Sequence, residues 1–90
     1  MTIKITVKGK VQGVFFRDTS KEVADRKNIR GTVENLENGD VQIIAQGKKK
    51  ALNDFLQWCE QGTEESEVTE VISEEIPNSN FLKNFIVKRW

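Results

Sequence analysis

Histidine is missing from this sequence of 90 residues, and cysteine occurs only once, at Cys59. Without histidine, metal centres of the usual His/Cys type, Ser-His-Asp triads and Cys-His catalysis are effectively excluded. A single cysteine cannot form an internal disulfide. Any chemistry must therefore use charge and position, and we expect neither a metal nor a cofactor.

A surplus of charge of either sign is also missing, because 14 basic residues balance 14 acidic ones. A neutral chain lacks the electrostatic footprint of a nucleic-acid-binding protein. No apolar run is long enough to span a bilayer, and no charged and then apolar leader opens the chain. We therefore expect a cytoplasmic monomer that binds neither nucleic acid nor a membrane, with residues 1–90 as one domain around a modest core.

One glycine-containing stretch lies between an alternating apolar run over residues 3–8, which predicts a strand, and a helical pattern over residues 18–28. It reads Gly9-Lys10-Val11-Gln12-Gly13-Val14-Phe15-Phe16-Arg17. The first N–H groups of a helix have no intrahelical partner, and glycines let a loop turn its own N–H groups toward one point. Arg17 adds a planar fork of donors that fits a phosphate. The stretch predicts an anion site; the alternative is a hairpin-like turn with a solvated Arg17.

A hairpin is predicted around Asn38-Gly39. A two-residue loop would turn Val33 away from Val41 and Ile43, whereas a three-residue loop over residues 37–39 puts one set of apolar residues on one face: Val33, Val41, Ile43 and Ala45. Asn35 has the same parity as Val33, so we expect it on the helix-covered face beside the anion loop. Glu34 is then expected on the opposite face.

The second helix is predicted from about Lys48 to Glu60, with an apolar stripe formed by Leu52, Phe55, Leu56 and Cys59. On that stripe Cys59 is interpreted as a core residue rather than a nucleophile. Three lysines, residues 48–50, lie at the helix start, where the dipole disfavours positive charge. We interpret them as a solvated face rather than a substrate-attracting patch, because the third strand ends at the edge opposite the anion loop.

The remaining chain has a weak strand pattern over residues 67–76, a turn over 77–80 and a final strand over 81–88, with Phe85 and Val87 facing inward. The order strand, helix, strand, strand, helix, strand fits an α+β fold, a two-layer ferredoxin-like sandwich (βαββαβ). We expect an antiparallel sheet with both helices on one face.

Two sequence blocks resemble the acylphosphatase family. The pattern Gly-x-Val-Gln-Gly-Val-x-Phe-Arg is complete over residues 9–17, and a second block, Gly-aromatic-x-x-Asn-x-x-x-Gly-x-Val, matches residues 31–41, followed by Gly47. The resemblance covers essentially the whole chain and implies the same sandwich with a short extra C-terminal strand. It also starts the first helix near Arg17. We favour that start over Ser20, which a capping-box pattern over residues 19–22 suggests, because it points the free amides at the loop.

The resemblance implies metal-independent hydrolysis of an acyl phosphate to a carboxylate and inorganic phosphate, which would act as product and inhibitor. Matching positions make Arg17 the phosphate-binding side chain and Asn35 the residue that orients the attacking water. The phosphate would also bind the backbone amides of Gly9, Lys10, Val11, Gln12, Gly13 and Val14. Asp18 would repel a phosphate if it faced the site, so we expect it to face away.

Three positions depart from the family pattern: Thr32 replaces an aromatic residue, Glu34 a basic or amide residue, and Thr63 a common proline. None of these changes removes a catalytic group. Arg17 could instead pair only with a carboxylate, and Asn35 could only cap a turn. The alternative function is a module of the same fold that binds phosphate or carboxylate without turnover. An RNA-binding sheet is disfavoured, because strand one offers lysine and threonine where exposed aromatics would be needed.

Overall fold

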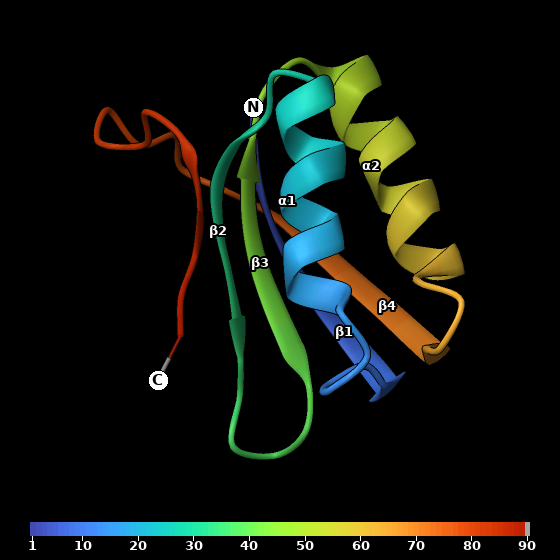
Figure 1. The fold of residues 1–90 in the computed structure, drawn as a ribbon. Helices are drawn as coiled ribbons and strands as arrows, with labels where there is room; N and C mark the ends of the chain where they lie inside the picture. Colours follow the sequence, from blue (N-terminus) through green and yellow to red (C-terminus); the bar gives the residue numbers. More distant parts are fainter. Residues whose placement is uncertain (90) are drawn as a thin grey trace.

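The computed structural model of the protein describes residues 1–89, which contain two helices packed on a five-stranded sheet (Figure 1). In chain order the elements are β1 (Thr2–Lys10), α1 (Phe16–Arg26), β2 (Arg30–Asn35), β3 (Val41–Gln46), α2 (Lys49–Gln61), β4 (Glu67–Ile76) and β5 (Phe85–Val87). The strand order across the sheet is β4-β1-β3-β2-β5. This is the predicted two-layer α+β sandwich with a short C-terminal strand.

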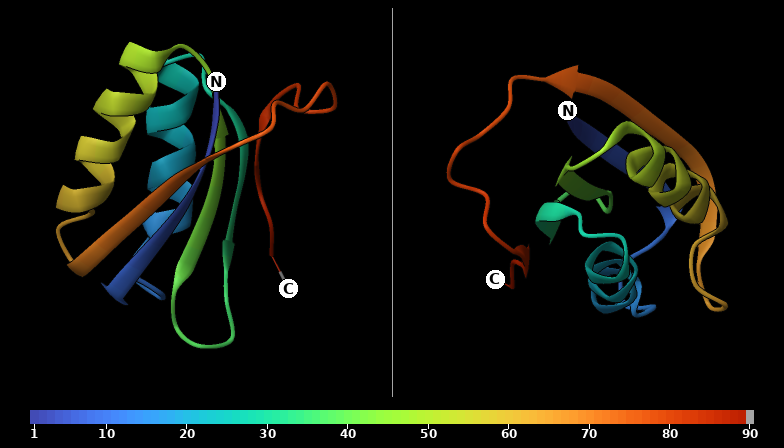
Figure 2. Two further views of the ribbon diagram at one scale, coloured as in Figure 1. Left: turned by 180° about the vertical axis from the view of Figure 1, so that it is seen from behind. Right: turned by 90° about the horizontal axis from the view of Figure 1, so that it is seen from above.

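Both helices cover the same face of the sheet (Figure 2), and the apolar alternation of the strands follows from this arrangement. Ile3, Ile5 and Val7 of β1 are buried. From the helices, Phe16, Ser20, Val23, Ala24, Leu52, Phe55 and Cys59 are buried against that face. The Phe16 and Trp58 ring centroids lie 5.0 Å apart, so the first residue of α1 packs directly against α2.

The β2–β3 hairpin has the predicted three-residue register. Val33 pairs with Ile43 and Asn35 with Val41, and the Leu36 N–H donates to the Asp40 carbonyl at 2.8 Å. Gly39 has φ 97°, as the turn requires of its third residue. The four residues predicted for the covered face, Val33, Val41, Ile43 and Ala45, are all fully buried.

The sheet is mixed rather than antiparallel, because β5 runs parallel to β2. The segment between β4 and β5 passes the side of the sheet away from the helices, from one edge to the other, and so delivers β5 in that direction (Figure 2). Gln46 holds this segment: its Nε2 donates to the Ser79 carbonyl at 3.0 Å, and its Oε1 accepts from the Ser79 N–H at 2.8 Å. The final strand is also shorter than predicted, and Phe81 is 90% exposed outside it.

The first helix begins at Phe16, so the earlier of the two predicted starts is confirmed and the capping box at Ser20 is wrong. The Ser20 hydroxyl instead donates to the Arg17 carbonyl at 2.7 Å, inside the first turn. Since β1 and β2 both run antiparallel to β3, they run in the same direction as each other. The loop after β1, the start of α1 and the end of β2 therefore lie at one end of the sheet.

Candidate active site

The loop between β1 and α1 enters the helix through a strained residue. Phe15, the N-cap of α1, has φ 63° and ψ 17°, a left-handed conformation that is costly for a bulky side chain. Its side chain makes no capping hydrogen bond and is 69% exposed, so packing does not account for the conformation. Strain of this kind gathers at functional sites, where the backbone geometry itself is required.

This geometry leaves a run of main-chain donors unpaired. The first backbone bond at the start of α1 goes from the Thr19 N–H to the Phe15 carbonyl, at 3.0 Å. Across the described chain, no backbone carbonyl accepts from the N–H groups of residues 12–18. Gly13 has φ 74° and an open space where a Cβ would stand, so it is needed for backbone shape and not for room. Loop amides followed by a helix N-terminus form an anion-binding concavity.

Arg17 lies in the first turn of α1 and is anchored by the C-terminal strand. Its Nη1 donates to the carbonyl of Lys88 at 3.0 Å, just beyond β5. Within residues 1–89 it forms no ion pair with any carboxylate, which argues against a purely structural pairing. The rest of its guanidinium fork is available to an anion.

Arg17 and Asn35 line the same pocket of about 250 Å³. The other lining residues are Val11, Gly13, Phe15, Phe16, Asp18 and Arg89. The Asn35 Oδ1 atom is buried and is the one such side-chain nitrogen or oxygen in the described residues without a hydrogen-bond partner. Within residues 1–89 the Asn35 side chain forms no hydrogen bond to a turn, which leaves the turn-capping alternative without support. A carboxamide with an unused hydrogen-bond acceptor thus lines the same pocket as the guanidinium.

The predicted loop residues divide into two groups. Val11 and Gly13 line the pocket, whereas Gly9 and Lys10 belong to β1 and pair with β4. Gly9 has a packing role there, because a Cβ on it would stand 2.1 Å from the Glu67 carbonyl oxygen.

Gln12 and Val14 fix the loop in place. The Gln12 Nε2 atom donates to the carbonyls of Leu36 and Asp40, both at 2.8 Å, and so holds the hairpin that carries Asn35. The Val14 carbonyl accepts from Thr63 Oγ1 at 2.8 Å. The threonine at a position where the family pattern has proline therefore supplies a loop anchor.

The prediction that Asp18 faces away from the site is wrong. Asp18 lines the pocket and pairs with Arg89. That ion pair offsets the negative charge which would otherwise repel a phosphate. Sequence reasoning missed Arg89. The basic pair after the last strand is visible in the sequence, but it reaches the site only because β5 runs parallel to β2, so that both strands finish at the end of the sheet where Asn35 lies.

Three further side chains lie outside the pocket lining. Glu34 pairs with Lys88 at 3.3 Å and is not part of the lining, as predicted. A hydrogen bond to the Asp40 carboxylate at 2.8 Å, together with its charge, raises the pKa of Lys8 above the ordinary 10.5. Burial raises the pKa of Cys59, so the thiol is held neutral in the core and is not a nucleophile.

Comparisons with known proteins identify the family of this chain. The family model described as acylphosphatase matches residues 3–87. The chain is 44% identical over 81 residues to an acylphosphatase of Dehalococcoides mccartyi, covering 88% of this chain and 89% of that protein. It is 37% identical over 86 residues to an acylphosphatase of Rubrobacter xylanophilus, covering 96% and 78% of the two chains.

A solved structure with the same arrangement is the acylphosphatase of Bacillus subtilis. It superposes with a TM-score of 0.93 at 32% identity, over 98% of both chains. Across residues 1–89, neither helix is long and apolar enough to cross a membrane. With the family model matching nearly the whole chain, this protein belongs to the acylphosphatase family, whose members hydrolyse acyl phosphates.

Proposed function

We propose that Arg17, Asn35 and the main-chain amides around them carry out acyl phosphate hydrolysis in this chain. The single observation that supports this assignment is the pocket that Arg17 and Asn35 both line, beside unpaired amides. The proposed amide donors lie in residues 12–18, and so extend further into α1 than the sequence suggested. Gly9 and Lys10 contribute through the position of β1 rather than through contact with phosphate.

In this mechanism the amides and Arg17 bind the phosphate and stabilise charge as its bond to the acyl group breaks. The Asn35 carboxamide orients a water molecule in line with the departing carboxylate. The water oxygen bonds to phosphorus, the bond from phosphorus to the acyl oxygen breaks, and the acyl oxygen keeps the electron pair. A phosphate oxygen accepts the proton of the water, and the products are a carboxylate and inorganic phosphate.

The chemistry of the pocket fits an acyl phosphate better than a phosphate ester. A carboxylate is a weak base and leaves without a general acid, whereas an alkoxide needs a proton. Among residues 1–89, the pocket lining includes one carboxylate, Asp18, and that group is paired with Arg89. The lining therefore provides positioning and charge stabilisation without a dedicated acid or base.

The proposal includes further expectations: residues 1–90 act as one acylphosphatase domain, the protein is a cytoplasmic monomer, and inorganic phosphate inhibits it. The second candidate function is a module that binds phosphate or carboxylate without turnover. It would use the same amides and the same guanidinium, so it differs from the enzyme only in turnover.

Release of phosphate from benzoyl phosphate separates the two functions. We expect turnover with inorganic phosphate as a competitive inhibitor, and an unchanged rate in the presence of a chelator. Phosphate binding without turnover would leave the binding module as the function. Loss of activity in the presence of the chelator would show that the mechanism above is wrong, because that mechanism uses side chains and amides alone.

A further inference from the structure

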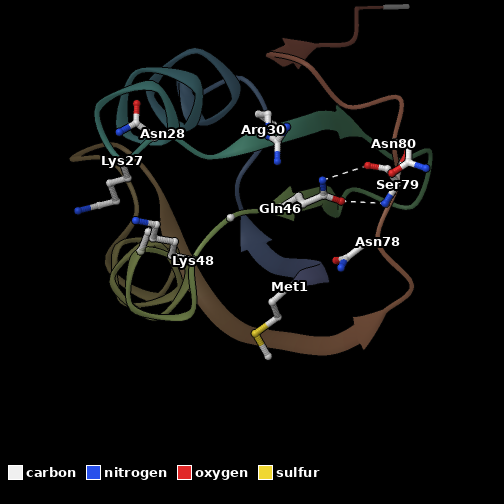
Figure 3. Close-up of a pocket in the computed structure, with 11 residues that line it drawn as sticks. Met1, Lys27, Asn28, Arg30, Gln46, Lys48, Asn78, Ser79 and Asn80 are labelled. Atoms are coloured by element: carbon white, nitrogen blue, oxygen red, sulfur yellow. Dashed lines mark hydrogen bonds between the residues drawn. The ribbon is translucent and has the colours of Figure 1, made fainter.

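A second cavity, of about 500 Å³, lies at the end of the sheet opposite the candidate active site (Figure 3). It is bounded by the end of α1, the start of β2, the end of β3, the start of α2 and the segment after β4. Most of its lining residues are polar or basic.

The charge around this cavity is of one sign. Lys27, Arg30 and Lys48 line it from three different parts of the fold, and none of the described residues that line it is acidic. None of these three side chains has an ion pair or hydrogen bond within the described part of the chain. In a chain whose charges balance, three unpaired cations around one cavity favour an anionic ligand with more than one negative charge.

The start of α2 adds donors to the same wall. Its N-cap, Lys48, makes no side-chain capping bond, and the first turn contains no acidic residue. The first intrahelical bond joins the Leu52 N–H to the Lys48 carbonyl at 3.0 Å, so the amides before Leu52 have no carbonyl within the helix. Ala51, which carries one of those amides, lines the cavity. The unfavourable dipole interaction of Lys48 would be relieved by an anion bound here.

The remaining wall of the cavity is polar, and some of its side chains already have hydrogen-bond partners within the protein. Figure 3 shows Lys27 and Lys48 on one side, the Asn78–Asn80 stretch on the other, and Arg30 and Gln46 between them. Gln46 is occupied by Ser79, but the side chains of Asn28 and Asn80 have no hydrogen bond within residues 1–89. The cavity is about twice the volume of the candidate catalytic pocket, so it has room for more than a phosphate group.

We infer that this cavity binds a phosphate monoester with a polar, hydroxylated body. The phosphate group is held by the cations and the α2 amides, and the body by the asparagine side chains. The site is separate from the hydrolytic one, because α1, about 16 Å long at 1.5 Å per residue, runs between them. It therefore does not depend on the function proposed above.

The test is an NMR titration of the ¹⁵N-labelled protein carrying Arg17→Ala, so that the candidate catalytic pocket does not compete. Ribose 5-phosphate, added at constant ionic strength, should shift the amides of residues 48–51 and 78–80 with one saturable Kd. Ribose alone should cause no shift, and inorganic phosphate should bind several-fold more weakly. Equal affinity for inorganic phosphate would overturn the role of the polar body.

Two matched triple variants complete the experiment. Removing the cavity cations with Lys27→Gln, Arg30→Gln and Lys48→Gln should weaken binding at least tenfold. Removing three cations from other surfaces with Lys4→Gln, Arg26→Gln and Lys83→Gln should leave the Kd within twofold. Equal losses in the two variants would overturn the site in favour of overall charge, and so would a linear, non-saturating shift. Spectra of both variants before titration show whether they are folded.

Discussion

At the scale of single residues, the pocket side chains are placed at a cost to stability. The Asn35 Oδ1 atom is buried without a partner, which typically costs a fold about 1–3 kcal/mol. Phe15 adds left-handed backbone strain under an exposed aromatic ring. Two unfavourable features within one small pocket indicate selection for a bound ligand rather than for stability.

Replacement of Arg17 tests the guanidinium. Arg17→Ala should raise the activation barrier for benzoyl phosphate by about 3–4 kcal/mol, the typical loss for a key charge-stabilising donor. Arg17→Lys keeps the charge but loses the planar fork, so its kcat/KM should recover only in part. Steady-state kinetics measure both. Arg26→Ala, in the last turn of the same helix, is the control and should retain wild-type rates. Unchanged turnover in Arg17→Ala would show that the site assignment is wrong.

Replacement of Asn35 separates catalysis from stability. Asn35→Ala removes the water-orienting carboxamide, so kcat should fall far more than phosphate affinity changes. It also removes a buried acceptor that has no partner, so the variant should unfold at no lower urea concentration than the wild type. Kinetics, phosphate inhibition and urea unfolding give the three readouts, with the exposed Asn53→Ala as the control. Lower stability with normal kcat would give Asn35 a structural role instead.

At the scale of elements, local sequence patterns predicted the hairpin register correctly and suggested a wrong start for the first helix. The hairpin register was predictable because only one register buries Val33 with Val41 and Ile43. The Ser20 capping box was misleading, since the loop before α1 sets the helix start and Ser20 bonds back to Arg17 instead. Whether a glycine serves the ligand or the packing also depends on neighbouring strands, which the motif alone does not reveal.

The two glycines of the first motif should therefore respond differently to alanine. Gly13→Ala adds a Cβ in open space and should cost about 1–2 kcal/mol of left-handed strain, with weaker phosphate inhibition. Gly9→Ala forces β1 away from the Glu67 carbonyl of β4 and should cost more stability, yet leave phosphate inhibition of the folded fraction unchanged. Urea unfolding and inhibition constants measure the two effects. The reverse ranking would return Gly9 to the phosphate-binding group.

At the scale of the whole molecule, the topology rather than any single motif assembles the site. The parallel course of β1 and β2 brings Arg17 and Asn35 to one end, and the crossing after β4 adds Lys88 and Arg89 there. The first part follows from a predictable βαβ unit. The second part was not predictable, because the segment over residues 77–84 has no repeating pattern that fixes its path or the direction of β5.

The same crossing places Phe85 of β5, at the far edge of the sheet, in the ring cluster with Phe55 of α2. Because this contact joins the edge strand to the helix layer, we expect the core to open as a unit. Cys59, fully buried and with a raised pKa, can report on this opening. A thiol-reactive disulfide reagent should modify it only at the rate of global unfolding, so the rate should rise with urea in step with unfolding. In the control, Cys59→Ala combined with Ser73→Cys, the exposed thiol should react at once. Fast modification of native Cys59 would show instead that α2 opens independently of the sheet.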